Sequence, residues 1–368
     1  MNIALLGFGT VGSHFYKLCE GRTDLHVAAV LSRRPRPELT CTVTADYDEI
    51  VRDPSIDIVV EVMGGIEPAY SYLCAAMRAG KHVVTANKQL MCARFDALIA
   101  LSEEMGVALR CTAAAGGGIP WLTSLSRASQ LDEITAVEGI LNGTTNYMLS
   151  AMTNSGADYA AALQKAQELG YAEADPTADV EGLDARRKLV LSADLAFGVN
   201  IKEEDIPCVG ISSITAADIA RAKEEGLTYK LITRAEKSGN AVAAFVCPTL
   251  FPSSAPEAHT DGTGNLATLY AARFGRQSFS GAGAGGYPTG SSVLRDCLDI
   301  ADGCRSFYAD SFVPRSVNLS GMQGKWLFRC MGETFVRECS AREAFNAYES
   351  YRKDDPHALL ARYAVDEE

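Results

Sequence analysis

Gly7-Phe8-Gly9-Thr10-Val11-Gly12 follows directly on the apolar run Ile3–Leu6 near the start of the chain. The apolar run predicts a buried strand, and the glycines have the G-x-G-x-x-G spacing of a dinucleotide-binding loop. Gly7 permits a tight turn, Gly9 lets phosphates approach the backbone, and Gly12 lets the next helix pack closely on the strand. We expect a helix from about Thr10 whose N-terminus holds a pyrophosphate, the alternative being a turn without a ligand.

Residues from Met1 to about Leu131 alternate short apolar runs with helical periodicity, which is typical of βαβ units. A helix is expected over Pro68–Ala79, closed by Gly80. The sequence therefore predicts an α/β fold with a Rossmann-type doubly wound parallel sheet, forming an NAD(P)-binding domain over residues 1–133. Strands are expected at Ile3–Leu6, Val27–Leu31, Ile58–Val62, His82–Thr85 and Ala108–Thr112.

The rest of the chain has a different organisation. Residues 134–280 are predicted to form a second, α+β substrate domain. Residues 281–310 hold a second glycine cluster, Gly281–Gly286, and an amphipathic helix over Ser291–Ile300, while residues 311–368 are a C-terminal tail. Strands are expected at Ala136–Ile140, Ala241–Val246 and Trp326–Arg329, and helices at Tyr159–Leu169, Leu183–Phe197, Ala216–Glu225 and Ala341–Arg352.

Composition excludes several classes of protein. The 368 residues carry a net charge of −12, which argues against a broad nucleic-acid surface. The chain has no signal-peptide pattern and no apolar run of about 18 residues, so a cytoplasmic location without membrane contact is expected. The 11 cysteines show no CxxC pair and are expected to be reduced and mostly buried. The 5 histidines are isolated, so no catalytic metal is expected.

The end of the second predicted strand bears on cofactor choice. An NAD site usually has an acidic residue there, about 20 residues after the glycine loop, to bind the ribose hydroxyls. This chain has Ser32, Arg33 and Arg34 instead. Guanidinium groups pair well with phosphate, so the sequence favours NADP, with its 2′-phosphate, over NAD. The alternative is that both arginines are simply solvated on a surface loop.

Six further motifs point to a family. They occur in order, Val60-Glu61-Val62-Met63-Gly64-Gly65-Ile66-Glu67-Pro68, Thr85-Ala86-Asn87-Lys88, Ala114-Ala115-Gly116-Gly117-Gly118-Ile119-Pro120, Gly139-Ile140-Leu141-Asn142-Gly143-Thr144-Thr145-Asn146-Tyr147, Glu168-Leu169-Gly170-Tyr171-Ala172-Glu173-Ala174-Asp175-Pro176 and Gly283-Ala284-Gly285-Gly286-Tyr287-Pro288-Thr289. With them the chain resembles homoserine dehydrogenases over about residues 1–305. The resemblance implies reversible NAD(P)-linked interconversion of L-aspartate 4-semialdehyde and L-homoserine, on the route to threonine, methionine and isoleucine.

The resemblance also implies roles for individual residues. By residue type alone, Asp184 and Lys188 lie four apart on one helical face and could form an ordinary surface salt bridge. In similar enzymes the residue matching Lys188 is the general acid/base, Asp184 orients it or binds the substrate's ammonium side, and Lys88 approaches nicotinamide and substrate. The resemblance further implies that Glu173 and Asp179 bind substrate, as do peptide groups of Gly143 and Thr144, and that the loop with Gly283 and Gly285 returns to the cofactor.

The resemblance also bears on a cation site, on regulation and on assembly. Thr112 occupies a position where the family usually has a glutamate that contributes to a sodium site, although carbonyls of Ala115, Gly117 and Ile119 could still bind a monovalent cation. The tail is too short for the ACT regulatory domain of many bacterial relatives, so threonine feedback through such a domain is not expected. The resemblance implies a homodimer formed through the substrate domain.

Two alternatives to homoserine dehydrogenase activity are a related NADP oxidoreductase acting on another small amino-acid aldehyde or hydroxy acid, and a non-catalytic NADP-binding regulator with the same fold. The presence of Lys88, Glu173, Asp184 and Lys188 together favours the homoserine reaction over both.

Overall fold

The computed structural model describes residues 1–304 and 312–364. The chain forms two compact units, each built from two stretches of sequence: Met1–Arg127 with Ala282–Phe312, and Ala128–Gly281 with Val313–Glu368. We describe each unit by itself. Residues 305–311 and 365–368 lie outside the described residues, so the predicted boundary between residues 310 and 311 does too.

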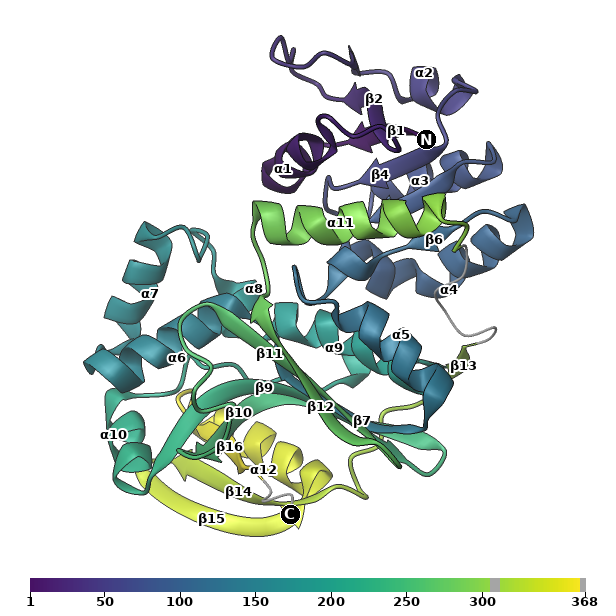
Figure 1. Ribbon diagram of the computed structural model, residues 1–368. Coiled ribbons are helices and arrows are strands. Elements are labelled where there is room, and N and C mark those ends of the chain that lie inside the picture. Colours follow the sequence, from purple (N-terminus) through teal and green to yellow (C-terminus); the bar gives the residue numbers. More distant parts are fainter. Residues whose placement is uncertain (305–311, 365–368) are drawn as a thin grey trace. The chain divides into compact units, whose positions relative to one another are not determined.

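The first unit is a doubly wound α/β domain (Figure 1). Its six strands are all parallel and have the order β3-β2-β1-β4-β5-β6, which is the strand order of dinucleotide-binding folds. The predicted fold class is thus confirmed. The elements are β1 Asn2–Leu6, α1 Thr10–Cys19, β2 His26–Leu31, β3 Thr42–Thr44, α2 Tyr47–Arg52, β4 Ile58–Glu61, α3 Ala69–Arg78, β5 His82–Thr85, α4 Lys88–Met105, β6 Leu109–Arg110, a 3-10 turn Thr112–Ala114, α5 Trp121–Leu131 and α11 Gly286–Ala301.

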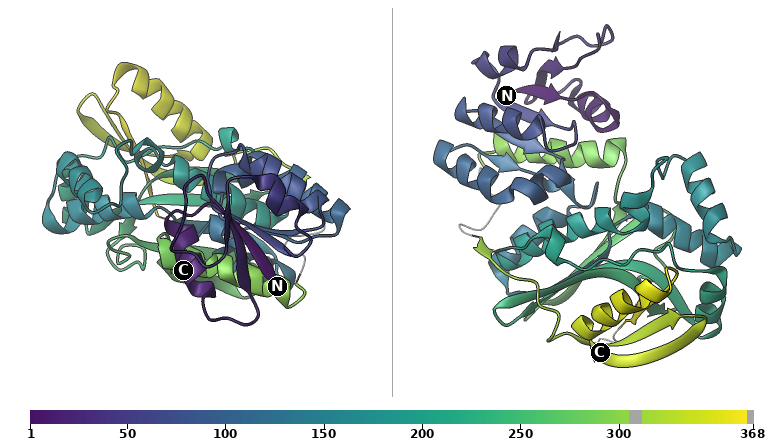
Figure 2. Two further views of the ribbon diagram at one scale, coloured as in Figure 1. Left: turned by 90° about the horizontal axis from the view of Figure 1, so that it is seen from above. Right: turned by 180° about the vertical axis from the view of Figure 1, so that it is seen from behind.

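Helices cover both faces of this sheet, which explains why its central strands are mostly apolar. All four residues of β4 are buried. Helix α11 comes from far along the chain and packs beside α1, on the face opposite α3 and α4 (Figures 1 and 2). Its Val293 and Cys297 enter the same core cluster as Phe15 of α1. The helix that follows the second glycine cluster is therefore an integral part of the cofactor-type domain.

Most predicted elements of this unit agree with the structure to within one residue at each end, and two differ by more. Strand β6 is only Leu109–Arg110, not Ala108–Thr112, because the Thr112 amide donates to the Asp296 carboxylate of α11 instead of a strand ladder. Helix α11 starts at Gly286 rather than Ser291. Pro288 does not prevent this, since amides in the first helical turn have no acceptor within the helix.

The second unit is built on an eight-stranded mixed sheet of order β12-β11-β7-β9-β10-β16-β14-β15, which agrees with the predicted α+β class. Its elements are β7 Ile134–Ile140, α6 Gly143–Ser155, α7 Tyr159–Glu168, α8 Thr177–Val180, α9 Leu183–Phe197, β8 Val199–Asn200, a 3-10 turn Glu203–Asp205, α10 Ala216–Glu224, β9 Leu227–Ser238, β10 Ala241–Pro252, β11 Gly264–Ala271, β12 Gly275–Ala282, β13 Val313–Pro314, β14 Gln323–Cys330, β15 Glu333–Ser340, α12 Ala341–Asp354 and β16 Leu359–Tyr363.

The central strand β10 is buried on both faces because different helices cover them. Phe245 and Cys247 enter a core cluster with Phe345 of α12. Val246, whose side chain alternates to the other face, lies beside Gly182, the N-cap of α9. The two-sided burial explains why β10 continues to Pro252, past the predicted end at Val246.

From Val313 on, the described part of the predicted C-terminal tail belongs to the second unit. Strands β14, β15 and β16 join the sheet of the second unit, and β16 pairs with both β10 and β14. The physical reason is burial, because Trp326 and Phe328 pack into the same core as Phe245. The contact pattern also places the first change of unit after Arg127, a few residues before the predicted boundary at 133.

The cysteines are all free, as expected, but the prediction that most are buried is wrong. Of the 11, five are buried (Cys19, Cys74, Cys111, Cys247, Cys297), five are half-buried and Cys304 is exposed. Among the helices within residues 1–304 and 312–364, none combines the length and apolarity needed to cross a membrane.

Candidate active site

The glycine loop of the first unit has the geometry that dinucleotide binding requires. Gly7 has φ 99°, a left-handed value that favours glycine. A Cβ on Gly12 would lie 2.3 Å from the Gly7 carbonyl oxygen, so only glycine lets α1 approach the loop this closely. A Cβ on Gly9 would meet no atom within 4 Å, which leaves space above the N-terminus of α1. The loop therefore fits a pyrophosphate held by backbone amides.

The second glycine cluster packs against two other parts of the same unit. A Cβ on Gly117 would lie 2.4 Å from the Gly283 carbonyl carbon, and one on Gly286 would lie 2.3 Å from Nδ1 of His14 in α1. The His14 ring also contacts the Tyr287 ring edge-on, at 4.5 Å between centroids. Gly285, at φ 119°, is the N-cap of α11. The cluster thus returns to the glycine loop of α1.

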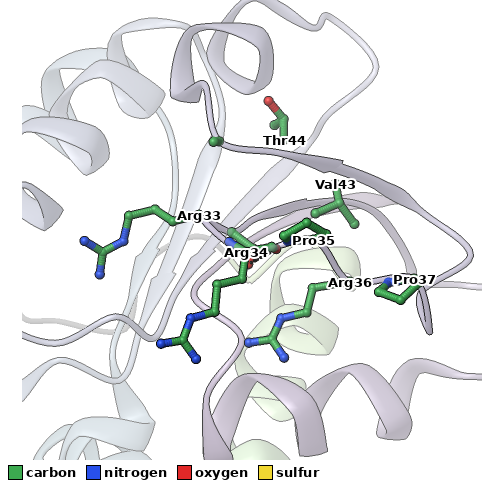
Figure 3. Close-up of a pocket in the computed structure, with 9 residues that line it drawn as sticks. Arg33, Arg34, Pro35, Arg36, Pro37, Val43 and Thr44 are labelled. Carbon is green, nitrogen blue, oxygen red and sulfur yellow. Dashed lines mark hydrogen bonds between the residues drawn. The ribbon is translucent and has the colours of Figure 1, made fainter.

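The residues predicted to read a 2′-phosphate lie after β2. The Ser32 hydroxyl donates to the Arg34 carbonyl at 2.8 Å and accepts from the Arg34 amide at 3.2 Å, which folds this segment into a tight turn. Arg33 and Arg34 are exposed. They line a cavity of about 430 Å³ with Arg36 and Thr44. In Figure 3 the side chains of Arg34 and Arg36 run side by side, while Arg33 extends in another direction.

Lys88 is half-buried at the first position of α4, at the carboxyl edge of the parallel sheet. The side chain of Asn87 caps this helix by accepting from the Leu90 amide at 3.0 Å and donates to the Gly65 carbonyl at 2.6 Å. The fully buried Glu61 carboxylate accepts from the Met63 amide at 2.7 Å. These bonds fix the two loops at the edge where α/β sheets bind ligands.

The second unit contains a buried lysine cluster around Lys188. Its Nζ donates to the Leu141 carbonyl at 2.6 Å and to Asp184 Oδ2 at 2.8 Å. Lys188 and Asp184 are only 7% and 8% exposed, so the predicted pair is not a surface salt bridge. An ammonium group has three N–H donors. In the part of the chain that the structure describes, two are used, which leaves one for a ligand.

Asn142 connects the members of this cluster. Its Nδ2 donates to Asp179 Oδ1 at 2.7 Å and to Asp184 Oδ2 at 2.9 Å. Its Oδ1 accepts from the Thr145 amide at 2.8 Å and so caps α6. Gly143 follows as the first residue of α6, where a Cβ would lie 3.0 Å from the Thr263 carbonyl oxygen.

The two predicted substrate carboxylates differ in environment. Burial raises the pKa of Asp179 above its ordinary value, an effect that the hydrogen bond from Asn142 opposes. Glu173 is exposed, and within the described ranges its carboxylate makes no hydrogen bond or ion pair. The Thr144 hydroxyl donates to the Tyr171 carbonyl at 2.6 Å, which ties the loop with Glu173 to α6. The structure therefore joins Asp179 to the lysine cluster but leaves the Glu173 side chain outside its hydrogen bonds.

Comparison with known proteins agrees with this geometry. The homoserine dehydrogenase family domain matches residues 120–298, and the homoserine dehydrogenase NAD-binding domain matches residues 7–112. The chain is 39% identical over 319 residues to homoserine dehydrogenase of Bacillus subtilis, covering 83% of this chain and 74% of the relative. The chain belongs to the homoserine dehydrogenase family. It is accordingly an oxidoreductase with an NAD-binding domain.

Two further homoserine dehydrogenases are similar. That of Corynebacterium glutamicum is 44% identical over 322 residues, covering 82% of this chain and 72% of the relative. The crystal structure of the Thiobacillus denitrificans enzyme superposes with a TM-score of 0.88 at 28% identity, covering 99% of this chain and 98% of that one. The latter match extends over the C-terminal strands that join the second sheet.

The sodium site of the family pattern finds little support in this chain. The Gly117 carbonyl accepts from the Ser292 hydroxyl at 2.5 Å, and the Ile119 carbonyl accepts from the Trp121 amide at 2.7 Å. Thr112 places a neutral hydroxyl against the Ser292 carbonyl at 3.5 Å. Within residues 1–304 and 312–364, no group of three or more His, Cys, Asp or Glu side chains could hold a metal. These residues do not fit a cation site well, and its occupancy stays a prediction.

Sequence reasoning missed several residues that shape the site. Asn142 and Asn87 lie inside the motifs, and their place directly before a helix could have identified both as N-caps. Glu61 ends a strand with a carboxylate, an unusual residue for a buried position. Arg36, beside the two predicted arginines, had no local signal beyond its charge.

Proposed function

We propose that this homoserine dehydrogenase interconverts L-aspartate 4-semialdehyde and L-homoserine with NADP, using Lys188 as general acid/base. The observation that carries the proposal is the buried Lys188 ammonium, fixed by the Leu141 carbonyl and Asp184 with one N–H remaining. A group held this way can donate a proton at a defined point, which is what carbonyl reduction requires.

The chain's own residues move the proton. Bound NADP would supply or accept the hydride at the substrate carbon. In the reducing direction Lys188 donates a proton to the aldehyde oxygen, and in the oxidising direction the neutral amine removes the hydroxyl proton of homoserine. Asp184 stabilises the ammonium form and, together with Leu141, fixes its direction. Lys88, at the sheet edge of the first unit, is proposed to contact nicotinamide and substrate.

The substrate's amino acid end is proposed to bind at the N-terminus of α6. Amides of Gly143 and Thr144 have no acceptor within the helix and can bind a substrate polar atom. Asp179 and Glu173 are the carboxylates proposed for the substrate ammonium group. Asp179 shares Asn142 with Asp184, so substrate binding and proton transfer would use one hydrogen-bonded network.

NADP is proposed to lie along the first unit, with its pyrophosphate on residues 7–12 and on the loop of Gly283 and Gly285. Ser32, Arg33 and Arg34 would bind the 2′-phosphate. The exposed position of both arginines on a cavity wall supports this, because a phosphate there needs no rearrangement of buried groups. As implied by the family, we also propose a homodimer and a role in threonine, methionine and isoleucine synthesis.

The test of the catalytic proposal is steady-state kinetics with L-homoserine and NADP⁺ on Lys188→Ala. Loss of a general base lowers kcat about 10²–10⁴-fold, and the affinity for NADP⁺ is expected to stay unchanged. Lys165→Ala is the matched control, since Lys165 forms an exposed ion pair with Glu168 on α7. A kcat within threefold of the parent enzyme for Lys188→Ala would refute the role of Lys188.

The cofactor proposal needs its own test. We expect the parent enzyme to have a higher kcat/KM with NADP⁺ than with NAD⁺. In Arg33→Met and in Arg34→Met, kcat/KM for NADP⁺ should fall roughly tenfold while kcat/KM for NAD⁺ stays unchanged. Arg52→Met, which removes an exposed arginine of α2, serves as control. Equal or better use of NAD⁺ by the parent enzyme would contradict the proposed preference.

A further inference from the structure

Arg36 lies on the same short loop as Arg33 and Arg34 but has a different environment. The Arg36 side chain is 30% exposed, whereas Arg33 and Arg34 are exposed. The guanidinium lies over the Phe8 ring at 5.1 Å from the centroid, and Nη2 donates to the Phe8 carbonyl at 3.3 Å. Arg36 therefore joins its loop to the glycine loop through both the ring and the backbone of one residue.

The contact continues through the glycine loop and back. The Phe8 ring meets the Tyr16 ring of α1 edge-on, at 5.8 Å between centroids. The Tyr16 hydroxyl lies 3.2 Å from Oγ1 of Thr40 and accepts from the Thr40 amide at 3.4 Å. Arg36 and Thr40 both belong to the loop between β2 and β3. These four residues, Arg36, Phe8, Tyr16 and Thr40, which we call the loop clamp, thus hold that loop at two points.

The sequence of the loop favours a fixed position for Arg36. Pro35 and Pro37 flank it, and proline restricts the backbone on either side. The Leu39 amide donates to the Arg36 carbonyl at 3.1 Å, closing a turn. The contacts of Arg36 with Phe8 hold this turn against the glycine loop, and Arg34 precedes the turn by two residues on the same loop.

The cavity beside the clamp gives this arrangement a consequence for the cofactor. Arg36 lines the cavity of about 430 Å³ together with Arg33 and Arg34 (Figure 3). Its Nη1 lies 3.7 Å from Glu38 and its Nη2 is bonded to Phe8. Its Nε is buried and has no hydrogen-bond partner within the described residues, so the guanidinium is only partly used within the chain. Through its bond to Phe8 it connects the pyrophosphate loop to the loop that carries the arginine side chains after β2.

We propose that Arg36 is a positioning residue for the 2′-phosphate site: through Phe8 it clamps the arginine-bearing loop to the glycine loop. The inference rests on the proposed NADP function and deepens it. In this arrangement the side chain of Phe8 serves as the platform for Arg36. Affinity for the 2′-phosphate then depends on a residue that acts by ordering Arg33 and Arg34 before the cofactor binds, since ordering a loop in advance removes an entropic cost of binding.

The test uses the full-length enzyme and compares Arg36→Met and Arg36→Lys. A cation over an aromatic ring and one hydrogen bond together correspond to about a tenfold change in binding. We expect both variants to lose about tenfold in affinity for NADP⁺, measured by titration, with less than twofold loss for NAD⁺. Lysine keeps the charge but not the planar group, so normal NADP⁺ affinity in Arg36→Lys would show that charge alone matters and would overturn the proposal.

A double-mutant cycle with Phe8→Leu separates positioning from direct phosphate contact. If Arg36 acts through Phe8, the double variant binds NADP⁺ no more than about twofold more weakly than the weaker single variant. Losses that multiply fully would indicate independent contacts and contradict the clamp. The NADP⁺ affinities of Arg33→Met, of Arg36→Met and of the double variant are compared in the same way to test whether Arg36 acts through Arg33, the proposed phosphate ligand.

Hydrogen exchange without cofactor keeps this inference separate from the NADP proposal. Amides of residues 33–41 are expected to exchange about tenfold faster in Arg36→Met and unchanged in Arg33→Met. If Arg33→Met and Arg34→Met leave NADP⁺ affinity unchanged, the proposed phosphate site fails, and the exchange result still decides whether the clamp exists. Unchanged exchange together with unchanged affinity in Arg36→Met would refute the clamp itself.

Discussion

Among the described residues, each unit of this enzyme contains a buried ion pair between a basic residue and an aspartate, Arg110–Asp296 in the first and Lys188–Asp184 in the second, and the two pairs differ in what surrounds them. In the first unit Arg110 donates to Asp296 at 3.1 Å and also pairs with Asp299, while Asp296 accepts from the Thr112 amide at 2.8 Å. In the second unit Lys188 pairs with Asp184 at 2.8 Å and keeps an N–H for a ligand. The first arrangement joins β6 to α11, and the second is suited to chemistry.

The difference teaches that burial of a charge does not by itself indicate a catalytic group. Desolvation makes any buried ion costly unless partners compensate it. Arg110 is 4% exposed at its side chain and Lys188 is 9% exposed, so the two are almost equally removed from water. The difference is that Lys188 keeps one N–H for a ligand, and that its acceptor Leu141 directly precedes the N-cap residue of α6. The following predictions test that distinction.

The largest expected effect is on stability, in Arg110→Met. Breaking a buried pair costs about 4 kcal/mol. Burial already raises the pKa of Asp296 to about 6 with Arg110 present. A carboxyl whose pKa is raised by folding stabilises the fold below its unfolded pKa and loses that contribution as pH rises. The variant's deficit in unfolding free energy, measured with urea, should therefore be larger at pH 8 than at pH 5.

The control for this prediction is Arg22→Met, which removes an exposed pair with Asp24 and is expected to change the unfolding free energy far less than Arg110→Met, because solvent screens the pair. An equal deficit for Arg110→Met at both pH values would mean that the Asp296 charge is not the cause.

The next effect, in Asp184→Asn, is on turnover. The amide keeps the shape of the side chain but removes the charge that fixes Lys188. We expect kcat with L-homoserine to fall about 100-fold, together with a loss of unfolding free energy, because Lys188 is left buried without its charged partner. Glu203→Gln, which loses half-buried pairs with Arg186 and Arg187, is the control from the same region. A large stability loss with normal kcat would make the two buried pairs alike.

A smaller effect concerns the pH dependence of substrate binding through Asp179. Burial raises the pKa of this carboxyl, so its charged form disappears at a higher pH than in a solvated aspartate. Binding of the homoserine ammonium needs that charge and is lost as pH falls through the raised pKa. The KM for L-homoserine should rise about tenfold per pH unit below it.

Asp179→Asn is expected to have a higher KM for L-homoserine at neutral pH and to lack the rise of KM at acidic pH. If the rise of KM at acidic pH persisted unchanged in the variant, another group would be its cause, with Glu173 the first candidate.

The smallest effect is expected from monovalent cations. Thr112 adds no charge beside the Gly117 and Ile119 carbonyls, and both carbonyls accept hydrogen bonds within the chain. Replacing NaCl by tetramethylammonium chloride at constant ionic strength should change kcat/KM less than about twofold, since weak neutral ligands bind a cation poorly. A strong, saturable dependence on sodium would establish the cation site that the family pattern implies.

Local sequence determined the elements that carry the site. Strand β5 and helix α9 have the predicted bounds, His82–Thr85 and Leu183–Phe197. Gly7 and Gly12 are required by backbone geometry within six residues of sequence. Such features depend on hydrophobic period and backbone freedom, which neighbouring residues decide among themselves.

Tertiary structure decided the partners of the charged groups. The Lys188 acceptor on Leu141 lies 47 residues away in sequence, and Arg110 finds Asp296 186 residues away. Arg36 had no sequence signal because its partner Phe8 lies 28 residues away, in the loop after β1. The family resemblance and the glycine spacing therefore came from sequence alone. Only contacts of the folded chain decided the different roles of the basic residues: Arg110 stabilises the fold, Arg36 holds a loop and Lys188 keeps an N–H for a ligand.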